Sequence, residues 1–282
     1  MSMQTVILLF QCADQKGIVA EVSDFIFRHD GNIITADQYS TDPENGHFFL
    51  RVEFYIDETL HDKKSLEAGL TPVAGHFNAD WKMYYKHERL RMGILVSKPD
   101  HCLVDLLYRW RSGELDVDIP FVISNYEGHR NIVKQYNIPF YFIAATKDDR
   151  REDETLKHAS RDSDFLILAR YMLILSGDFL DKYGKDIINI HHSFLPSFKG
   201  AAPYRQAFER GVKVIGATAH FVTETLDEGA IISQIVEGVS HKDGVDDLER
   251  KGKNMEKQAL SHAVYNYIDY RIIKYRNKTI VF

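Results

Sequence analysis

Apolar residues recur with strand and helix periods over the first 86 residues. These periods predict, in chain order, a strand at 6–10, a helix at 18–29, strands at 33–40 and 47–56, a helix at 62–77 and a strand at 81–85. In the first helix, Ile18, Val22, Phe25 and Ile26 fall on one face. The order strand-helix-strand-strand-helix-strand is the ferredoxin-like arrangement, so we expect a small domain at 1–86.

A second series of elements begins after a charged run at 86–91, which we interpret as a linker. The predicted strands lie at 92–96, 119–124, 139–143 and 165–168, near 187, near 216 and at 279–282. The predicted helices lie at 102–110, 129–136, 152–160 and 177–183, after Pro203 and at 245–273. Strands that alternate with helices predict a mainly parallel, doubly wound α/β domain at 91–282.

Composition narrows the class of protein. The chain has 282 residues, which suits two modest domains. A hydrophobic fraction of 44% and a charged fraction of 27% are ordinary for a soluble globular protein. The formal net charge of -6 argues against nucleic acid as the main partner, because phosphate binding needs a basic surface.

Cysteines and terminal residues indicate the compartment. Cys12 and Cys102 match no metal-binding spacing and favour reduced thiols in a cytosolic protein. The amino terminus lacks the pattern of a signal peptide, and no apolar run approaches the roughly 20 residues of a membrane span. We therefore expect a cytoplasmic protein without a membrane partner. We expect no metal site either, because His191 and His192 are adjacent on a predicted strand and point to opposite faces.

Two apolar runs end in side chains suited to carbonyl chemistry. Asn189 and His191 lie two apart on a predicted strand, so they point the same way at its end. His220 ends the next run, and Asp227 follows it in a turn closed by Gly229. An amide, an imidazole and a carboxylate suffice to attack a carbonyl and to stabilise the oxyanion that forms. The alternative interpretation is polar residues in ordinary turns, where Asn, Asp and His are common.

The string Asn-Ile-His-His-Ser-Phe-Leu-Pro-Ser-Phe-Lys-Gly starts at Asn189 and is specific. Together with the turn that holds Asp227, it resembles the catalytic half of the folate-dependent formyltransferase family, and the resemblance extends over nearly the whole chain. It implies that Asn189, His191 and Asp227 are catalytic, that 10-formyltetrahydrofolate is the substrate and that no cofactor is needed. His220 is expected to support these three, with a purely structural role as the alternative. Whether His191 or Asp227 is the base does not follow from sequence.

A leucine-rich stretch at 168–175 follows a predicted core strand and suits the apolar slot that a pterin ring needs. By the same resemblance, four residues are expected to contact the folate: Met172, Leu173, Leu175 and Thr223. The alternative is that this stretch is plain core. Three basic residues could attract the glutamate tail of a folate: Lys199, Arg205 and Arg210. For the two arginines, a solvated helix face is an equal explanation.

The loop after the strand at 92–96 bears on the acceptor of the formyl group. Transformylases of this family have a glycine-rich loop there that cradles a phosphate. This chain has Ser97-Lys-Pro-Asp-His-Cys102, in which Pro99 lacks an N–H and Asp100 adds negative charge. The resemblance therefore implies the hydrolytic branch, with formate and tetrahydrofolate as products, in one-carbon metabolism and purine biosynthesis. Two alternatives stay open: transfer to an amine of the glycinamide ribonucleotide type, and a non-catalytic folate-sensing regulator.

The amino-terminal domain contains Asp14-x-x-Gly17 and Gly31-Asn32-Ile33. It resembles the ACT domain, a module that commonly binds amino acids in regulated metabolic enzymes. The resemblance implies an amino-acid effector near four residues: Asp14, Gly17, Asn32 and Ile33. ACT domains usually pair, so we expect a homo-oligomer, either a dimer or a tetramer. The alternative is a domain that only dimerises the enzyme.

Overall fold

The structure of the protein is a computed structural model that describes residues 3–42, 44–57, 62–197 and 203–282. The chain divides into two compact units, each with its own hydrophobic core. The first unit comprises the residues up to Arg89 together with 270–273 and 280–282. The second unit comprises residues 90–269 and 274–279.

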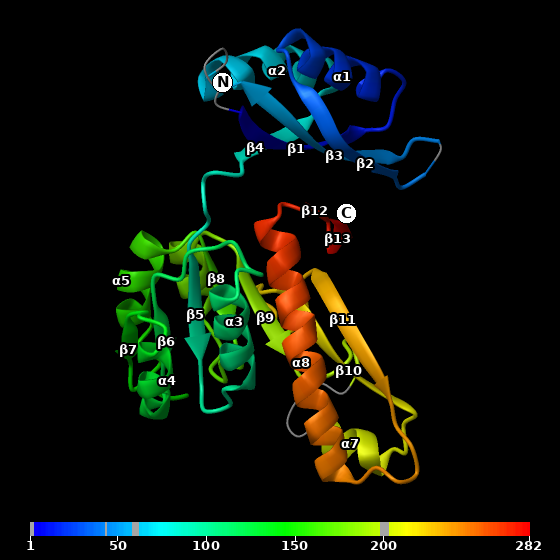
Figure 1. Ribbon diagram of the computed structural model, residues 1–282. Coiled ribbons are helices and arrows are strands. Elements are labelled where there is room, and N and C mark those ends of the chain that lie inside the picture. Colours follow the sequence, from blue (N-terminus) through cyan, green and yellow to red (C-terminus); the bar gives the residue numbers. More distant parts are fainter. Residues whose placement is uncertain (1–2, 43, 58–61, 198–202) are drawn as a thin grey trace. The chain divides into compact units, whose positions relative to one another are not determined.

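The first unit is a four-stranded antiparallel sheet, in the order β2-β3-β1-β4, with two helices on one face (Figure 1). Its elements are β1 (Met3–Ala13), α1 (Ile18–Arg28), β2 (Asn32–Ser40), β3 (His47–Asp57), α2 (Lys63–Phe77) and β4 (Asp80–Tyr85). Asp62 begins α2 as an N-cap, since its carboxylate accepts from the N–H of Ser65 at 2.7 Å. The order of elements confirms the predicted ferredoxin-like arrangement.

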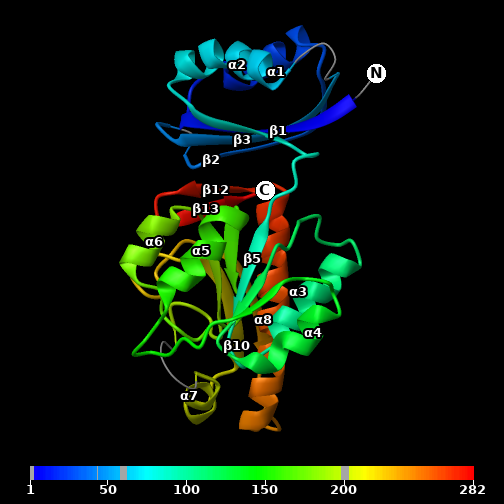
Figure 2. The same ribbon diagram turned by 90° about the vertical axis from the view of Figure 1, so that its left-hand side faces the viewer.

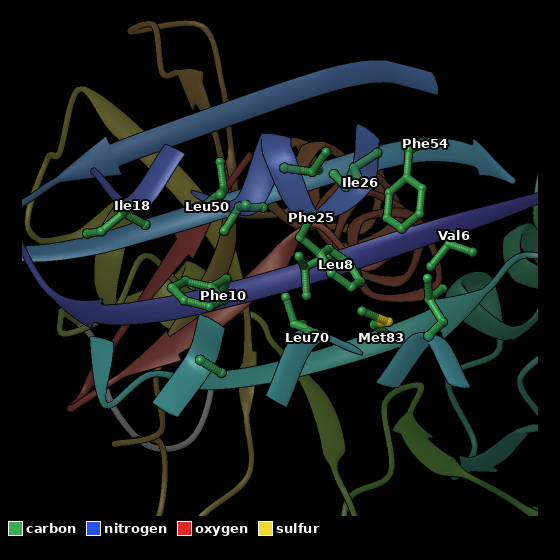
Figure 3. Packing of buried hydrophobic residues seen from close by; sticks show 14 of the residues in the cluster. Val6, Leu8, Phe10, Ile18, Phe25, Ile26, Leu50, Phe54, Leu70 and Met83 are labelled. Carbon is green, nitrogen blue, oxygen red and sulfur yellow. The ribbon is translucent and has the colours of Figure 1, made fainter. Parts of the chain in front are cut away.

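Alternate residues of β1 build the core of the first unit. Leu8 and Phe10 point toward the helices, where Phe25 of α1 belongs to the same buried cluster (Figure 3). Fully burying such a side chain contributes about 1.5–3 kcal/mol, so this cluster can hold the helices on the sheet. Strand β2 differs, because it lies at the edge of the sheet and residues 32–39 are all exposed.

The second unit is built on a seven-stranded sheet in the order β11-β10-β9-β8-β5-β6-β7. Its strands are β5 (Met92–Val96), β6 (Val122–Ser124), β7 (Phe140–Phe142), β8 (Phe165–Leu168), β9 (Ile187–His191), β10 (Val214–Phe221) and β11 (Ile231–Gly238). Strands β5 to β9 pair in parallel, whereas β10 is antiparallel to both β9 and β11. The mainly parallel sheet is thus confirmed.

Helices cover both faces of this sheet (Figure 2). They are α3 (His101–Arg111), the short 3-10 turn η1 (Glu127–His129), α4 (Arg130–Lys134), α5 (Glu152–Asp162), α6 (Gly177–Tyr183), α7 (Pro203–Glu209) and α8 (Val245–Ile268). Helices α3, α4 and α8 lie on one face, and α5 and α6 on the other. Among the described residues, no helix is long and apolar enough to cross a membrane.

The strand order defines where a ligand is expected. From β5 the chain proceeds outward to β6 and β7, then returns to β8 on the opposite side of β5. This reversal makes the carboxyl ends of β5 and β8 a topological switch point, where open α/β sheets bind their ligands. The loops at this point begin at Ser97 and Ala169, and β9 with its polar residues is the next strand.

The carboxyl-terminal third differs from the prediction in two places, one a missing strand and the other a wrong helix end. Strand β11 was not predicted, although its β-branched residues Ile231, Ile232, Ile235 and Val236 are the expected signal. Helix α8 ends at Ile268 rather than at 273, because Tyr270 adopts a left-handed conformation with φ 51°. The segment beyond it forms the two-stranded sheet of β12 (Ile272–Tyr275) and β13 (Lys278–Val281).

Candidate active site

Strands β9 and β10 place an amide and two imidazoles side by side. Asn189 and His191 are two residues apart on β9 and therefore project from the same face. In the antiparallel pair, His220 of β10 lies directly opposite Asn189. Side chains at opposed positions of neighbouring strands are in contact range, so pairing register alone assembles three of the predicted residues.

The turn between β10 and β11 supplies the carboxylate. Asp227 has φ 57°, a left-handed conformation that Asp tolerates better than most residues. Gly229 closes the turn against the backbone of β10, where a Cβ would lie 1.7 Å from the carbonyl oxygen of Phe221. The N–H of Phe221 donates to the carbonyl of Ala230 at 3.0 Å, which fixes the turn beside the strand.

The carboxylate of Asp227 faces both imidazoles. Its Oδ1 lies 3.3 Å from Nδ1 of His191 and 3.6 Å from Nε2 of His220. Burial alone would raise the pKa of Asp227, but the two imidazoles outweigh burial and hold the pKa well below its usual range. Asp227 is therefore ionised at any pH near neutrality.

Hydrogen bonds assign the tautomer of His220. Its Nδ1 lies 2.8 Å from the carbonyl oxygen of Phe221, which can only accept, so Nδ1 carries a proton. In the neutral ring, Nε2 then accepts from the amide Nδ2 of Asn189 at 3.3 Å. The distance of 3.6 Å from Nε2 to Asp227 is too long for a hydrogen bond, so His220 acts mainly on Asn189. His220 thus orients the amide of Asn189.

One nitrogen of this group is buried without a partner. His191 is 6% exposed, and its Nε2 has no hydrogen-bond partner among the described residues. Buried polar atoms are nearly always paired, so an unpaired one calls for a ligand or a function. We call Asn189, His191, His220 and Asp227 the active-site cluster.

The residues expected to contact folate do not form one group. Met172 is 50% exposed, and Leu173 is half-buried. Leu175 belongs to the hydrophobic core of the unit, as the plain-core alternative suggested for this stretch. Thr223 is exposed, and its hydroxyl donates to the carbonyl of Thr225 at 3.0 Å.

The basic residues considered for a folate tail give no further support. Arg205 and Arg210 are exposed on or beside α7, which fits a solvated helix face. Lys199 lies outside the described residues.

The residues expected to bind an effector lie at two places. Asp14 follows β1, where its carboxylate accepts from the hydroxyl of Ser40 at 2.5 Å, and Gly17 precedes α1 with φ 97°. Asn32 and Ile33 lie beyond the other end of α1 and are exposed. Helix α1 has 11 residues and spans about 16 Å, so the two pairs do not meet within one chain.

Sequence reasoning missed a second polar group around Glu256 of α8. Oε2 of Glu256 lies 2.7 Å from Nε2 of His101 and 3.2 Å from Nε of Arg170, and Oε1 accepts from the hydroxyl of Tyr204 at 2.9 Å. Burial alone would raise the pKa of Glu256, but His101, Arg170 and Tyr204 outweigh it and lower the pKa. We call these four residues the Glu256 cluster.

The Glu256 cluster lies next to a candidate set of metal ligands. Among the described residues, ligand atoms of His101, Cys102 and Glu256 lie within 4.8 Å of one another. The carboxylate is already paired with the guanidinium of Arg170, which would repel a cation. Burial also raises the pKa of the Cys102 thiol well above its usual value, so the thiol stays protonated and is a poor ligand. These groups do not fit a metal.

Comparison with known proteins defines the class of this protein. Residues 90–264 match the formyl transferase family, and residues 6–62 match the ACT domain. The formyltetrahydrofolate deformylase of Bacillus subtilis is 48% identical over 98% of this chain and 93% of its own length. That of Synechocystis is 46% identical over 99% of this chain and 98% of its own length.

Solved structures agree with this assignment. The crystal structure of a formyltetrahydrofolate deformylase from Pseudomonas syringae matches with a TM-score of 0.92 and 41% identity, covering 100% of this chain and 95% of that one. The chain belongs to the family of formyltetrahydrofolate deformylases.

Proposed function

We propose that this protein hydrolyses 10-formyltetrahydrofolate to formate and tetrahydrofolate. Its relatives are named for this activity, and both family matches fit it. The observation that carries the proposal at the level of residues is the buried Nε2 of His191, which has no hydrogen-bond partner in the described part of the chain and lies beside an amide and an ionised carboxylate. These are the groups that hydrolysis of a formamide needs.

Asn189 stabilises the oxyanion in this mechanism. Its amide has two N–H groups, and His220 accepts from one of them and so fixes its direction. The second N–H is then free to donate to the formyl oxygen as negative charge develops on it. A donor of this kind contributes roughly a hundredfold to a thousandfold in rate.

His191 is the base in this mechanism, and Asp227 orients it. The ionised Asp227 holds the proton of His191 on Nδ1, which leaves a lone pair on Nε2. Nε2 takes a proton from water as the water oxygen attacks the formyl carbon. It then returns that proton to N10 of the folate as the carbon–nitrogen bond breaks, and formate departs.

Hydrolysis rather than transfer fits the loop after β5. The hydroxyl of Ser97 accepts from the N–H of Met172 at 2.9 Å. The backbone carbonyl of Ser97 accepts from Nε2 of His129 at 2.8 Å. This loop is therefore engaged with its own neighbours and offers no glycine-rich cradle for a phosphorylated amine.

Regulation and assembly complete the proposal. The ACT domain takes an amino-acid effector, and a homo-oligomer, either a dimer or a tetramer, brings the Asp14 and Gly17 pair of one chain toward the Asn32 and Ile33 pair of another. Met172 and Leu173 contact the folate from the loop after β8. The reaction adjusts cytoplasmic one-carbon pools and supplies formate for purine synthesis, without a cofactor.

Water labelled with oxygen-18 gives a direct test. The purified chain, mixed with 10-formyltetrahydrofolate, is expected to release formate with one labelled oxygen and an equal amount of tetrahydrofolate. Asn189→Ala should lower the rate roughly a hundredfold to a thousandfold, because the oxyanion loses its donor. His262→Asn changes an exposed histidine of α8 and should leave the rate unchanged. Absence of formate, or consumption of 10-formyltetrahydrofolate only when an amine is supplied, would contradict the proposal.

A further inference from the structure

The two loops at the switch point of the sheet contact each other. Ser97 follows β5 and Arg170 follows β8, and the N–H of Ser97 donates to the carbonyl of Arg170 at 3.2 Å. A ligand of an open α/β sheet normally sits between two such loops. Here Ser97 is only 4% exposed and Glu256, from α8, only 2% exposed. Buried polar side chains of the protein therefore lie at this switch point.

The Glu256 cluster brings side chains from several elements together near this switch point. A Cβ added at Gly252 would lie 2.1 Å from Cζ of Tyr204, so glycine is needed for the tyrosine ring to pass the helix. The ring then reaches Glu256, one turn further along α8. His101 and Arg170 approach the other carboxylate oxygen from α3 and from the loop after β8. Three distant segments therefore converge on one buried carboxylate.

His192 connects this cluster to the active-site cluster. Its ring centroid lies 5.1 Å from that of His191 and 6.4 Å from that of Tyr204. The ring of His192 therefore lies between Tyr204 of the Glu256 cluster and the imidazole to which we assign the role of base.

We propose that the Glu256 cluster excludes amine acceptors, so that water alone receives the formyl group; this inference rests on the proposed hydrolysis. In transfer, an amine nitrogen would attack the formyl carbon and lose a proton, while the bond to N10 breaks and N10 gains a proton. Asn189, His191 and Asp227 could serve both reactions. The difference is space, because an amine needs room beside the formyl carbon that a water molecule does not.

The double variant Arg170→Gly/Glu256→Gln tests this exclusion. It removes both charges together, so neither is left unpaired, and glycine suits the φ of 64° at residue 170. The full chain is mixed with 10-formyltetrahydrofolate and glycinamide, and formate and N-formylglycinamide are quantified. We expect the ratio of formylated amine to formate to rise about tenfold or more over the wild type. His262→Asn, on the same helix, should not change the ratio.

A double variant that is folded by circular dichroism and still yields formate alone would overturn the proposal. If that variant does not fold or has no activity, His101→Ala decides by the same ratio. Its side chain is 15% exposed, and its loss leaves Glu256 paired with Arg170. An unchanged ratio in His101→Ala would again overturn the proposal. A wild-type chain that releases no formate would instead refute the hydrolysis itself.

Discussion

The active-site cluster and the Glu256 cluster use similar groups at the same end of one sheet. Each is organised by a carboxylate that stays ionised because its neighbours outweigh the cost of burial. They differ in what is left unpaired. Both oxygens of Glu256 have partners. Among the described residues, Nε of Arg170 and Nε2 of His191 are both buried without a hydrogen-bond partner, but Nε of Arg170 still lies 3.2 Å from its counter-ion Glu256, whereas Nε2 of His191 has no such neighbour. A free nitrogen can react with a substrate, while a fully paired carboxylate fixes the positions of its neighbours.

The two carboxylates also lie in different kinds of backbone, one in a turn and the other inside a long helix. Asp227 lies in a turn with a left-handed conformation, at a place where one side chain is aimed at two imidazoles. Glu256 lies inside the 24-residue helix α8 and joins segments that are far apart in sequence. We therefore expect changes at Asp227 to cost mainly activity and changes at Glu256 to cost mainly stability.

The largest difference between the two clusters is expected in the effect of their carboxylates on kcat. Asp227→Asn removes the charge that holds the proton of His191 on Nδ1, so the ring can adopt the wrong tautomer. A loss of about a thousandfold to ten-thousandfold in kcat is expected, as for other oriented histidine bases. Glu256→Gln keeps the volume of the side chain and should cost no more than about tenfold. Steady-state formate release measures both, and equal losses would abolish the distinction between the clusters.

The free energy of unfolding should rank the two substitutions in the reverse order, with the larger loss at Glu256. Glu256→Gln leaves the guanidinium of Arg170 buried without its counter-ion, since both side chains are at least 87% buried. Breaking a buried pair in this way costs about 3–5 kcal/mol in the free energy of unfolding. Asp227→Asn should cost less, because the oxygen of the new amide can still accept from Nδ1 of His191. Urea unfolding measures both values, and Arg170→Gly/Glu256→Gln should regain most of the loss. A larger loss for Asp227→Asn would contradict the assignment.

The fold was largely predictable because its signals are local. The apolar run of β1 and the apolar face of α1 each lie within a dozen residues, and both appear in the structure as predicted. The wrong end of α8 has a different cause. The residues up to 273 are compatible with a helix, and only the left-handed turn at Tyr270 stops it, which no cap residue announces.

The two clusters differ in predictability for the same reason. Asn189 and His191 are neighbours on one strand, and Asp227 follows in a recognisable turn, so sequence reasoning found them together. Glu256 has a role only through His101 and Tyr204, which are 155 and 52 residues away. A charged residue between the buried Met255 and Ala259 was the available signal, because an acid on the apolar face of a helix calls for a partner.

His192 lies between the two clusters and gives the smallest expected effect, on the pH dependence of stability. Burial, followed by the charges of Arg170 and His191, lowers its pKa from 6.5 to about 4, against weaker opposite contributions of Glu256 and Asp227. Between these two values the unfolded chain binds a proton that the folded chain does not. The stability is therefore fully present above pH 6.5 and is lost as the pH falls toward 4, by at most about 3 kcal/mol.

His192→Phe should flatten this part of the pH profile, because it keeps a ring against Tyr204 but cannot take up a proton in the unfolded chain. The free energy of unfolding in urea, measured between pH 4 and 6.5 for both proteins, gives the difference in slope. His262→Asn removes an exposed histidine from α8 and should keep the slope of the wild type. If His192→Phe also kept that slope, His192 would not be the group that makes the free energy of unfolding depend on pH between 4 and 6.5.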